Sequence, residues 1–261
     1  MYNLYIQTNS DYKERSRQVI FVYKTCLLFY FSGNLTKQKE RQIIMITSAL
    51  REPVNALTHM AGAIASLAGL ILLVVFASIN AGAWHIVSFS IFGATLLMMY
   101  TASTLYHAVN LSENGIATMR RIDHVMIFLL IAGSYTPFCM VPLRGAWGWT
   151  LLSLVWSMAL IGSVLKIFFM NIPRWISTAI YLVMGWLCVA AIYPLAKSLE
   201  TASLLWLIGG GVFYSTGAVI YGLKRPNPWP KVFGFHEIWH LFVLAGSFCH
   251  FWSVFRYLTY M

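Results

Sequence analysis

The sequence predicts an all-α fold in which seven transmembrane helices form a bundle. Hydrophobic residues make up 59% of the 261 positions and charged residues only 10%, a composition far too apolar for a single soluble domain. After residue 45, apolar stretches of about 20 residues recur, and each is long enough to cross a bilayer. We therefore expect an integral membrane protein.

Seven segments have the length and hydrophobicity that a membrane span requires, and short polar linkers separate them. They cover residues 53–79, 84–109, 123–141, 147–169, 175–196, 203–223 and 236–257. The proline-rich stretch 225–230 cannot continue a helix, so it separates the last two spans. Residues 52–261 are expected to form one seven-helix membrane domain.

The first 51 residues differ in composition from the rest of the chain. They are polar and basic around a short apolar patch, residues 19–31, which Lys24 interrupts. A span needs about 20 apolar residues, so this patch is too short and too charged to be one. We expect residues 1–51 to be a cytoplasmic N-terminal segment that is disordered, or an upstream extension of a native protein that starts at Met45.

The basic residues predict how the helices are oriented. If alternate loops are assigned to one side, that side holds the N-terminal segment and Arg120, Arg121, Lys166, Arg174, Lys224, Arg225 and Lys231. The other side holds Arg144, Lys197 and Arg256. Because positive charge is retained on the cytoplasmic side, we expect the N-terminus inside and the C-terminus outside. Orientation also explains the net charge of +10, so no nucleic-acid partner is expected.

The strongest chemical signal is the pair His236 and His240 at the start of the last span. Residues four apart lie on one face of a helix, about one turn from each other, so the two imidazoles can bind one metal ion. Two ordinary histidines at a helix start would give the same spacing. Polar side chains near the ends of membrane spans are costly and usually functional, however, which favours a metal site.

The predicted orientation brings three more polar residues to the depth of this pair. Ser103 and His107 lie four residues apart near the inner end of the second span, and Asp123 begins the third. Each has an ordinary explanation, since Asp123 would suit a helix N-terminus and Ser103 could bond its own backbone. Their common depth instead favours one shared site near the cytoplasmic surface.

Three neutral imidazoles, from His107, His236 and His240, fit zinc best, because zinc takes nitrogen ligands in tetrahedral geometry. Three protein ligands leave one position for water, as in catalytic zinc sites. Asp123 could take a proton from that water or orient it, and Ser103 could hold the water or a developing oxyanion. We therefore predict Asp123 and Ser103 as the catalytic residues.

Four short motifs form a joint pattern: Glu52-x2-Asn55-x2-Thr58-His59, Ser103-x3-His107, Asp123 and His236-x3-His240. The pattern spans about residues 52–257 and resembles the bacterial hemolysin III family, which is related to the progestin and adiponectin receptors and more distantly to alkaline ceramidases. The resemblance implies a seven-helix membrane fold with zinc held by the three histidines. By analogy, it implies hydrolysis of an amide or ester bond in a membrane lipid, in the cytoplasmic membrane of a bacterium.

Two other functions stay open. In a non-catalytic cytolysin or sensor, zinc would only tie the second and seventh spans together. Alternatively, residues 236–240 match the H-E-x-x-H motif of zinc metalloproteases, in which the glutamate, here Glu237, is the general base. The protein would then be an intramembrane protease.

Five further polar residues are expected to support the site. Glu52, Asn55 and His59 lie at the inner start of the first span, where they could lock helices or bond the second ring nitrogens of the zinc ligands. A glutamate favoured at a helix N-terminus and a surface histidine are equally good explanations. Ser247 and His250 fall near the face of His236, so we expect them to line a cavity above the metal, unless His250 is an ordinary core histidine.

Overall fold

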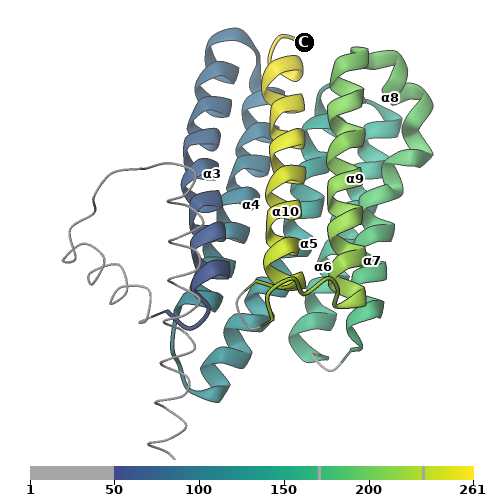
Figure 1. The fold of residues 1–261 in the computed structure, drawn as a ribbon. Helices are drawn as coiled ribbons and strands as arrows, with labels where there is room; N and C mark the ends of the chain where they lie inside the picture. The colour runs from purple at the N-terminus through teal and green to yellow at the C-terminus, as the bar shows by residue number, and fades with distance from the viewer. Residues whose placement is uncertain (1–49, 170–171, 231–232) are drawn as a thin grey trace, which may run out of the picture.

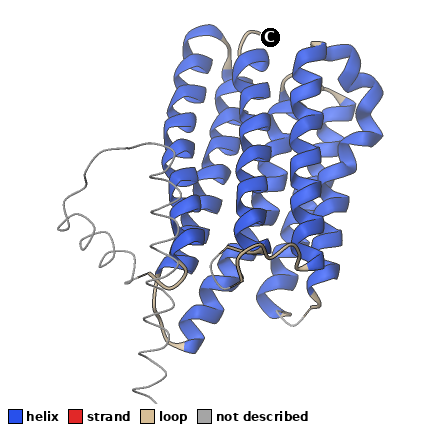
Figure 2. Cartoon of the chain, viewed as in Figure 1, coloured by secondary structure: helices blue, strands red, loops and turns tan. Residues whose placement is uncertain are grey.

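Seven long helices form one bundle, and the described residues contain no strand (Figures 1 and 2). The computed structural model describes residues 50–169, 172–230 and 233–261. Within these ranges, seven helical segments are long and apolar enough to cross a membrane. The predicted fold class is therefore confirmed. The predicted N-terminal segment lies almost entirely outside the described residues.

The helices follow the predicted spans closely. In chain order they are α3 (Pro53–Asn80), α4 (Ala83–Ala108), α5 (Glu113–Met140), α6 (Ala146–Phe168), α7 (Arg174–Trp186), η1 (Leu187–Ala191), α8 (Ile192–Ser198), α9 (Thr201–Leu223), α10 (Phe235–Ser253) and η2 (Val254–Leu258). The fifth span combines α7, η1 and α8, and the seventh combines α10 and η2. Pro53 opens α3, a position where its missing N–H costs no hydrogen bond.

The third helix begins earlier than predicted, at Glu113 instead of Asp123. The Ser112 hydroxyl caps it by accepting a hydrogen bond from the Gly115 N–H at 3.4 Å. Residues 113–122 are too polar for hydropathy to count them as membrane span, yet they continue the helix. Asp123 therefore lies about three turns inside α5. The helix dipole, which acts within the first turn, does not explain its presence there.

The fifth span changes its helical geometry at η1, and Tyr135 of α5 lies at this change. Its hydroxyl oxygen is 2.8 Å from the Met184 carbonyl oxygen and 2.7 Å from that of Gly185. The same hydroxyl accepts a hydrogen bond from the Cys188 N–H at 3.0 Å. Backbone groups that leave the helical ladder need partners inside a membrane. Tyr135 thus satisfies the groups that the change of geometry releases.

The last span packs centrally, against α9 on one side and α3 on the other (Figure 1). Glycines permit the close approach of α9 and α10. A side chain at Gly210 would overlap the His250 ring, and one at Gly246 would come within 2.9 Å of the Tyr214 ring. Small residues of this kind let membrane helices pack backbone to backbone. The position of α10, which carries two of the predicted metal ligands, is fixed by this packing.

The start of α3 and the C-terminus lie at opposite ends of the bundle (Figure 1). This agrees with an odd number of membrane crossings in the described part of the chain. The assignment of the α3 start to the cytoplasmic side remains a prediction from the distribution of basic residues.

Candidate metal centre and its cavity

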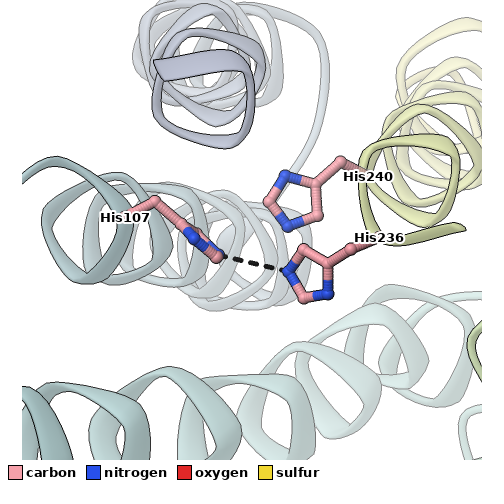
Figure 3. Close-up of side chains that lie close together, drawn as sticks. All are labelled: His107, His236 and His240. Atoms are coloured by element: carbon pink, nitrogen blue, oxygen red, sulfur yellow. Dashed lines mark hydrogen bonds between the residues drawn. The ribbon is translucent and has the colours of Figure 1, made fainter. Parts of the chain in front are cut away.

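The three predicted metal ligands meet at one end of the bundle (Figure 3). His107 lies in the last turn of α4, while His236 and His240 lie in the first two turns of α10. Their candidate ligand nitrogens all lie within 4.8 Å of one another, and the Nε2 atoms of His107 and His236 are 3.4 Å apart. The structure thus brings together the three histidines that the sequence pattern selected.

This spacing would allow the three nitrogens to hold one metal ion. With zinc–nitrogen bonds of ~2.0–2.1 Å, neighbouring ligand nitrogens would lie about 3.3 Å apart, close to the 3.4 Å between His107 and His236. The Nδ1 atom of His107 donates to the Glu52 carboxylate at 2.6 Å, and that of His240 lies 3.3 Å from the Thr58 hydroxyl oxygen. Contacts of this kind orient an imidazole ring and leave its Nε2 available to a metal ion.

Glu52 lies at the start of α3, outside the membrane-spanning segment, and its carboxyl is charged. Burial alone would raise the pKa of this carboxyl. The hydrogen bond and the electrostatic interaction with His107, together with the positive charge of Arg51, oppose that effect and lower the pKa from 4.5 to about 2. The guanidinium of Arg51 lies 3.3 Å from the second carboxylate oxygen. Glu52 therefore presents a full negative charge to the Nδ1–H of His107.

Asn55 and His59 lie beside Glu52 on α3 and contact the last span. The Asn55 amide donates to Glu52 Oε2 at 3.3 Å and to Glu237 Oε1 at 2.9 Å, so it links α3 to α10. The His59 ring stacks on His240 with ring centroids 3.5 Å apart, and neither of its nitrogens has a hydrogen-bond partner among the described residues. His59 is 3% exposed, so the interpretation as a surface histidine is wrong.

Ser103 and Asp123 lie next to the histidine cluster and line the same cavity. Ser103 precedes His107 by one turn of α4 and lies within interaction range of the Asp123 carboxylate on α5. The packing of α4 along α5 produces this pairing. The expected meeting of three spans at one site is therefore present, and the catalytic roles of the two residues remain predictions.

Glu237, the central residue of the H-E-x-x-H match, is engaged elsewhere. Its Oε2 atom accepts a hydrogen bond from the Gly234 N–H at 2.8 Å, and its Oε1 atom accepts one from Asn55 at 2.9 Å. The first contact satisfies a free N–H at the start of α10, as in a helix capping box. A general base has to reach the proton that it abstracts. In this structure Glu237 instead stabilises the helix that presents His236 and His240.

A cavity of about 830 Å³ extends from the histidine cluster into the bundle. This volume falls in the range of ligand pockets, ~300–1,000 Å³. Away from the histidines its wall includes apolar and aromatic side chains, among them Leu130, Ile131, Leu182, Trp186 and Val243. The cavity therefore joins a polar end, which contains the candidate metal centre, to an apolar interior.

The two residues predicted to line this cavity differ in their placement. His250 lies on its wall, and its Nε2 donates to the Leu207 carbonyl oxygen at 3.2 Å. Ser247 is not part of the wall. Its hydroxyl oxygen lies between Tyr100 and Tyr214, 2.7 Å from each phenolic oxygen. A buried hydroxyl needs hydrogen-bond partners, so Ser247 serves the packing between α4, α9 and α10.

Several residues of the site had no assigned role in the sequence. Thr58 belongs to the first quoted motif, but only the structure shows its contact with His240. Tyr100 and Tyr214 could have been identified as bonded groups, because a phenol inside an apolar span needs a partner. Lys166 and Arg174 line the cavity. The sequence used them only to orient the chain, since it does not say where a basic side chain at a helix end points.

The fold and the cluster define a multi-pass membrane protein with a candidate metal centre of three histidines at one end of a helical bundle. A family model described as "Haemolysin-III related" matches residues 47–251. The chain belongs to this family, as the motifs of Glu52, Ser103, Asp123 and His236 indicated.

Individual relatives support this assignment. The "Hemolysin-3 homolog" of Bacillus subtilis (strain 168) is 45% identical over 206 residues, which cover 79% of this chain and 93% of the relative. "Hemolysin-3" of Bacillus cereus is 40% identical over 220 residues, or 84% of this chain and 97% of the relative. The "Monocyte to macrophage differentiation factor" of Homo sapiens is 25% identical over 183 residues, covering 67% and 72%.

Proposed function

We propose that the protein is a zinc-dependent hydrolase that cleaves an amide or ester bond of a lipid in the bacterial cytoplasmic membrane. One observation carries this proposal: the three histidines, Asp123 and an extended apolar wall share one cavity. A lipid can place its acyl chain along the apolar wall while its polar bond lies at the histidines. The similarity to two Bacillus proteins supports a bacterial membrane.

The donor set favours zinc, because neutral imidazole nitrogens suit it better than magnesium or calcium, which take oxygen ligands. When bound, zinc supplies Lewis acidity that activates water and polarises a carbonyl group. Asp123 accepts the proton of the attacking water and returns it to the leaving nitrogen or oxygen. Ser103, which shares the cavity wall with Asp123, orients the Asp123 carboxylate.

The proposal is tested by metal analysis of the purified protein, followed by assays on a panel of lipid amides and esters. We expect Asp123→Asn to lower kcat by ~10²–10⁴-fold, the usual contribution of a general base, while bound zinc stays unchanged. Glu237→Gln is the matched control, since it makes the same chemical change to a carboxylate that faces Asn55 and Gly234. Activity lost only in Glu237→Gln would contradict the proposal and favour the protease.

The second candidate is a non-catalytic membrane cytolysin or sensor with a structural metal ion. One observation favours it: His107 of α4 and the two histidines of α10 would tie together helices far apart in sequence. The names of the two Bacillus relatives also refer to hemolysis. In this case the lipid panel would yield no activity with wild-type protein, and a zinc chelator would unfold the bundle.

A further inference from the structure

Three basic side chains line the cavity without a role in the proposed hydrolysis. Lys166 comes from the end of α6, Arg174 from the first residue of α7 and Arg120 from α5. Their helix ends lie at the end of the bundle where α10 begins (Figure 1). His124, one turn after Arg120 on α5, lies within electrostatic range of all three. The polar end of the cavity therefore has a strongly cationic side.

Lys166 is the most unusual member of this group because it is only 4% exposed. Its ammonium donates one hydrogen bond, to the Ser177 hydroxyl oxygen at 2.6 Å. A lysine has three donors, and a buried charge is costly unless it is paired. Ser177 supplies a dipole and no negative charge. A bound anion that pairs with this ammonium and accepts its remaining hydrogen bonds would explain why Lys166 is buried.

The described part of the chain does not supply that anion. The carboxylate ion pairs found there are those of Glu52 with Arg51 and His107. The guanidinium carbon of Arg174 lies over the rings of Tyr221 and Phe235, at 4.6 and 5.6 Å from their centroids. Lys166 thus has a hydroxyl partner and Arg174 has aromatic partners, and no described carboxylate lies within ion-pair distance of Lys166, Arg120 or Arg174.

Membrane orientation alone does not account for this placement. Retention of positive charge requires basic residues on one side of the membrane, without regard to where their side chains point. Arg121, next to Arg120 on α5, and Lys224 and Arg225, after α9, satisfy that rule without lining the cavity. Lys166 would satisfy it equally well from an exposed position.

We propose that Lys166, Arg120 and Arg174 bind the anionic head, a phosphate or a carboxylate, of an amphiphile whose chain lies in the 830 Å³ cavity. Guanidinium and ammonium groups are the usual partners of such oxyanions. This inference names the class of ligand for the proposed lipid hydrolase, and it rests on that proposed function in assuming that the ligand is a lipid. It concerns binding alone and requires no bond cleavage.

Binding is measured with ether lipids, which contain no ester or amide bond, on the full-length purified protein in detergent. The probes are 1-O-hexadecylglycerol 3-phosphate, the same molecule without phosphate, and inorganic phosphate. We expect the phosphorylated lipid to bind at least tenfold more tightly than the neutral one. Arg120→Gln and Lys166→Met should each remove most of this preference, because a charge-assisted contact commonly accounts for about a tenfold change in affinity. Arg121→Gln, the matched control, should keep it.

The outcomes separate binding from folding and from catalysis. Lys166→Arg keeps the charge and should retain the preference, and a thermal unfolding curve for each variant identifies those that no longer fold. Equal affinity of wild-type protein for the two lipids would overturn the proposal, as would equal losses in Arg120→Gln and Arg121→Gln. If inorganic phosphate bound as tightly as the phosphorylated lipid, the proposal would also be overturned, since the hexadecyl chain of the lipid would then contribute nothing to the affinity. None of these results depends on whether the protein hydrolyses lipids.

Discussion

Glu52 is the residue that connects the candidate metal centre to the fold. Its carboxylate bonds Nδ1 of His107 at 2.6 Å, and its backbone N–H donates to the His107 carbonyl oxygen at 2.9 Å. Arg51 and Asn55 contact the same carboxylate. A single residue therefore joins the start of α3 to the end of α4, and its carboxylate fixes the direction of one candidate ligand.

We predict that Glu52→Gln weakens zinc binding ten- to a hundredfold, the usual cost of losing a carboxylate partner of a metal-bound histidine. Glutamine keeps the size of the side chain, but its neutral oxygen makes a weaker hydrogen bond to the His107 Nδ1–H. Competition with a zinc-binding dye measures the affinity. Glu113→Gln, which removes the same charge at the exposed start of α5, should leave it unchanged. Equal affinities in the two variants would contradict this role.

At the scale of the helices, the seam between α9 and α10 holds the site in position. Gly210 faces α10, where an added Cβ would overlap the His250 ring and lie 3.1 Å from the Gly246 carbonyl oxygen. Its neighbour Gly209 has nothing within 4 Å of the same position. The two glycines thus experience opposite environments on adjacent positions of one helix.

We predict that Gly210→Ala lowers the free energy of unfolding by ~1–3 kcal/mol, the usual cost of overpacking a tight core. Gly209→Ala should be neutral or slightly stabilising, because alanine is favoured over glycine in a helix by roughly 0.5–1 kcal/mol. Chemical denaturation in detergent micelles measures both changes. If the two variants unfolded alike, close packing at Gly210 would not hold α9 against α10.

For the whole molecule, hydropathy was enough to predict the seven-helix fold, because each span is a long apolar run. It failed at the start of α5, where the segment between Glu113 and Arg121 is polar but helical. The cap at Ser112 was a local signal that could have extended the prediction. The change to η1 had no such signal, since it depends on the Tyr135 hydroxyl from another helix.

For the candidate site too, some features could be predicted from residue spacing in the sequence, and others depend on packing between helices. Helical spacing predicted that His236 and His240 lie on one face. The common depth of three spans predicted that Ser103 and Asp123 lie near them. No pattern along the chain could show that Glu237 is turned toward Asn55 and Gly234, or that Lys166 points into the cavity. Those directions follow from contacts between helices that are distant in sequence.

The orientation of the bundle in the membrane is predicted from its basic residues. The histidine end carries Arg51, Arg120, Arg121, Lys166, Arg174, Lys224 and Arg225, and the opposite end carries Arg144, Lys197 and Arg256. This bias predicts the histidine end in the cytoplasm. Alkaline phosphatase needs disulfides, which form in the periplasm but not in the cytoplasm. Fused after Met261, it should therefore be active, and fused after Lys224, inactive.

A fluorescent protein that matures only in the cytoplasm serves as the reciprocal control and should give the opposite result at both positions. Active phosphatase after Lys224 would show that the bundle has the opposite orientation in the membrane. The cationic side of the cavity would then face the outside, although retained positive charge marks the cytoplasmic side. In the predicted orientation, the anionic amphiphile that we propose would reach Lys166 from the inner leaflet, so the cavity would take its ligand from the cytoplasmic side of the membrane.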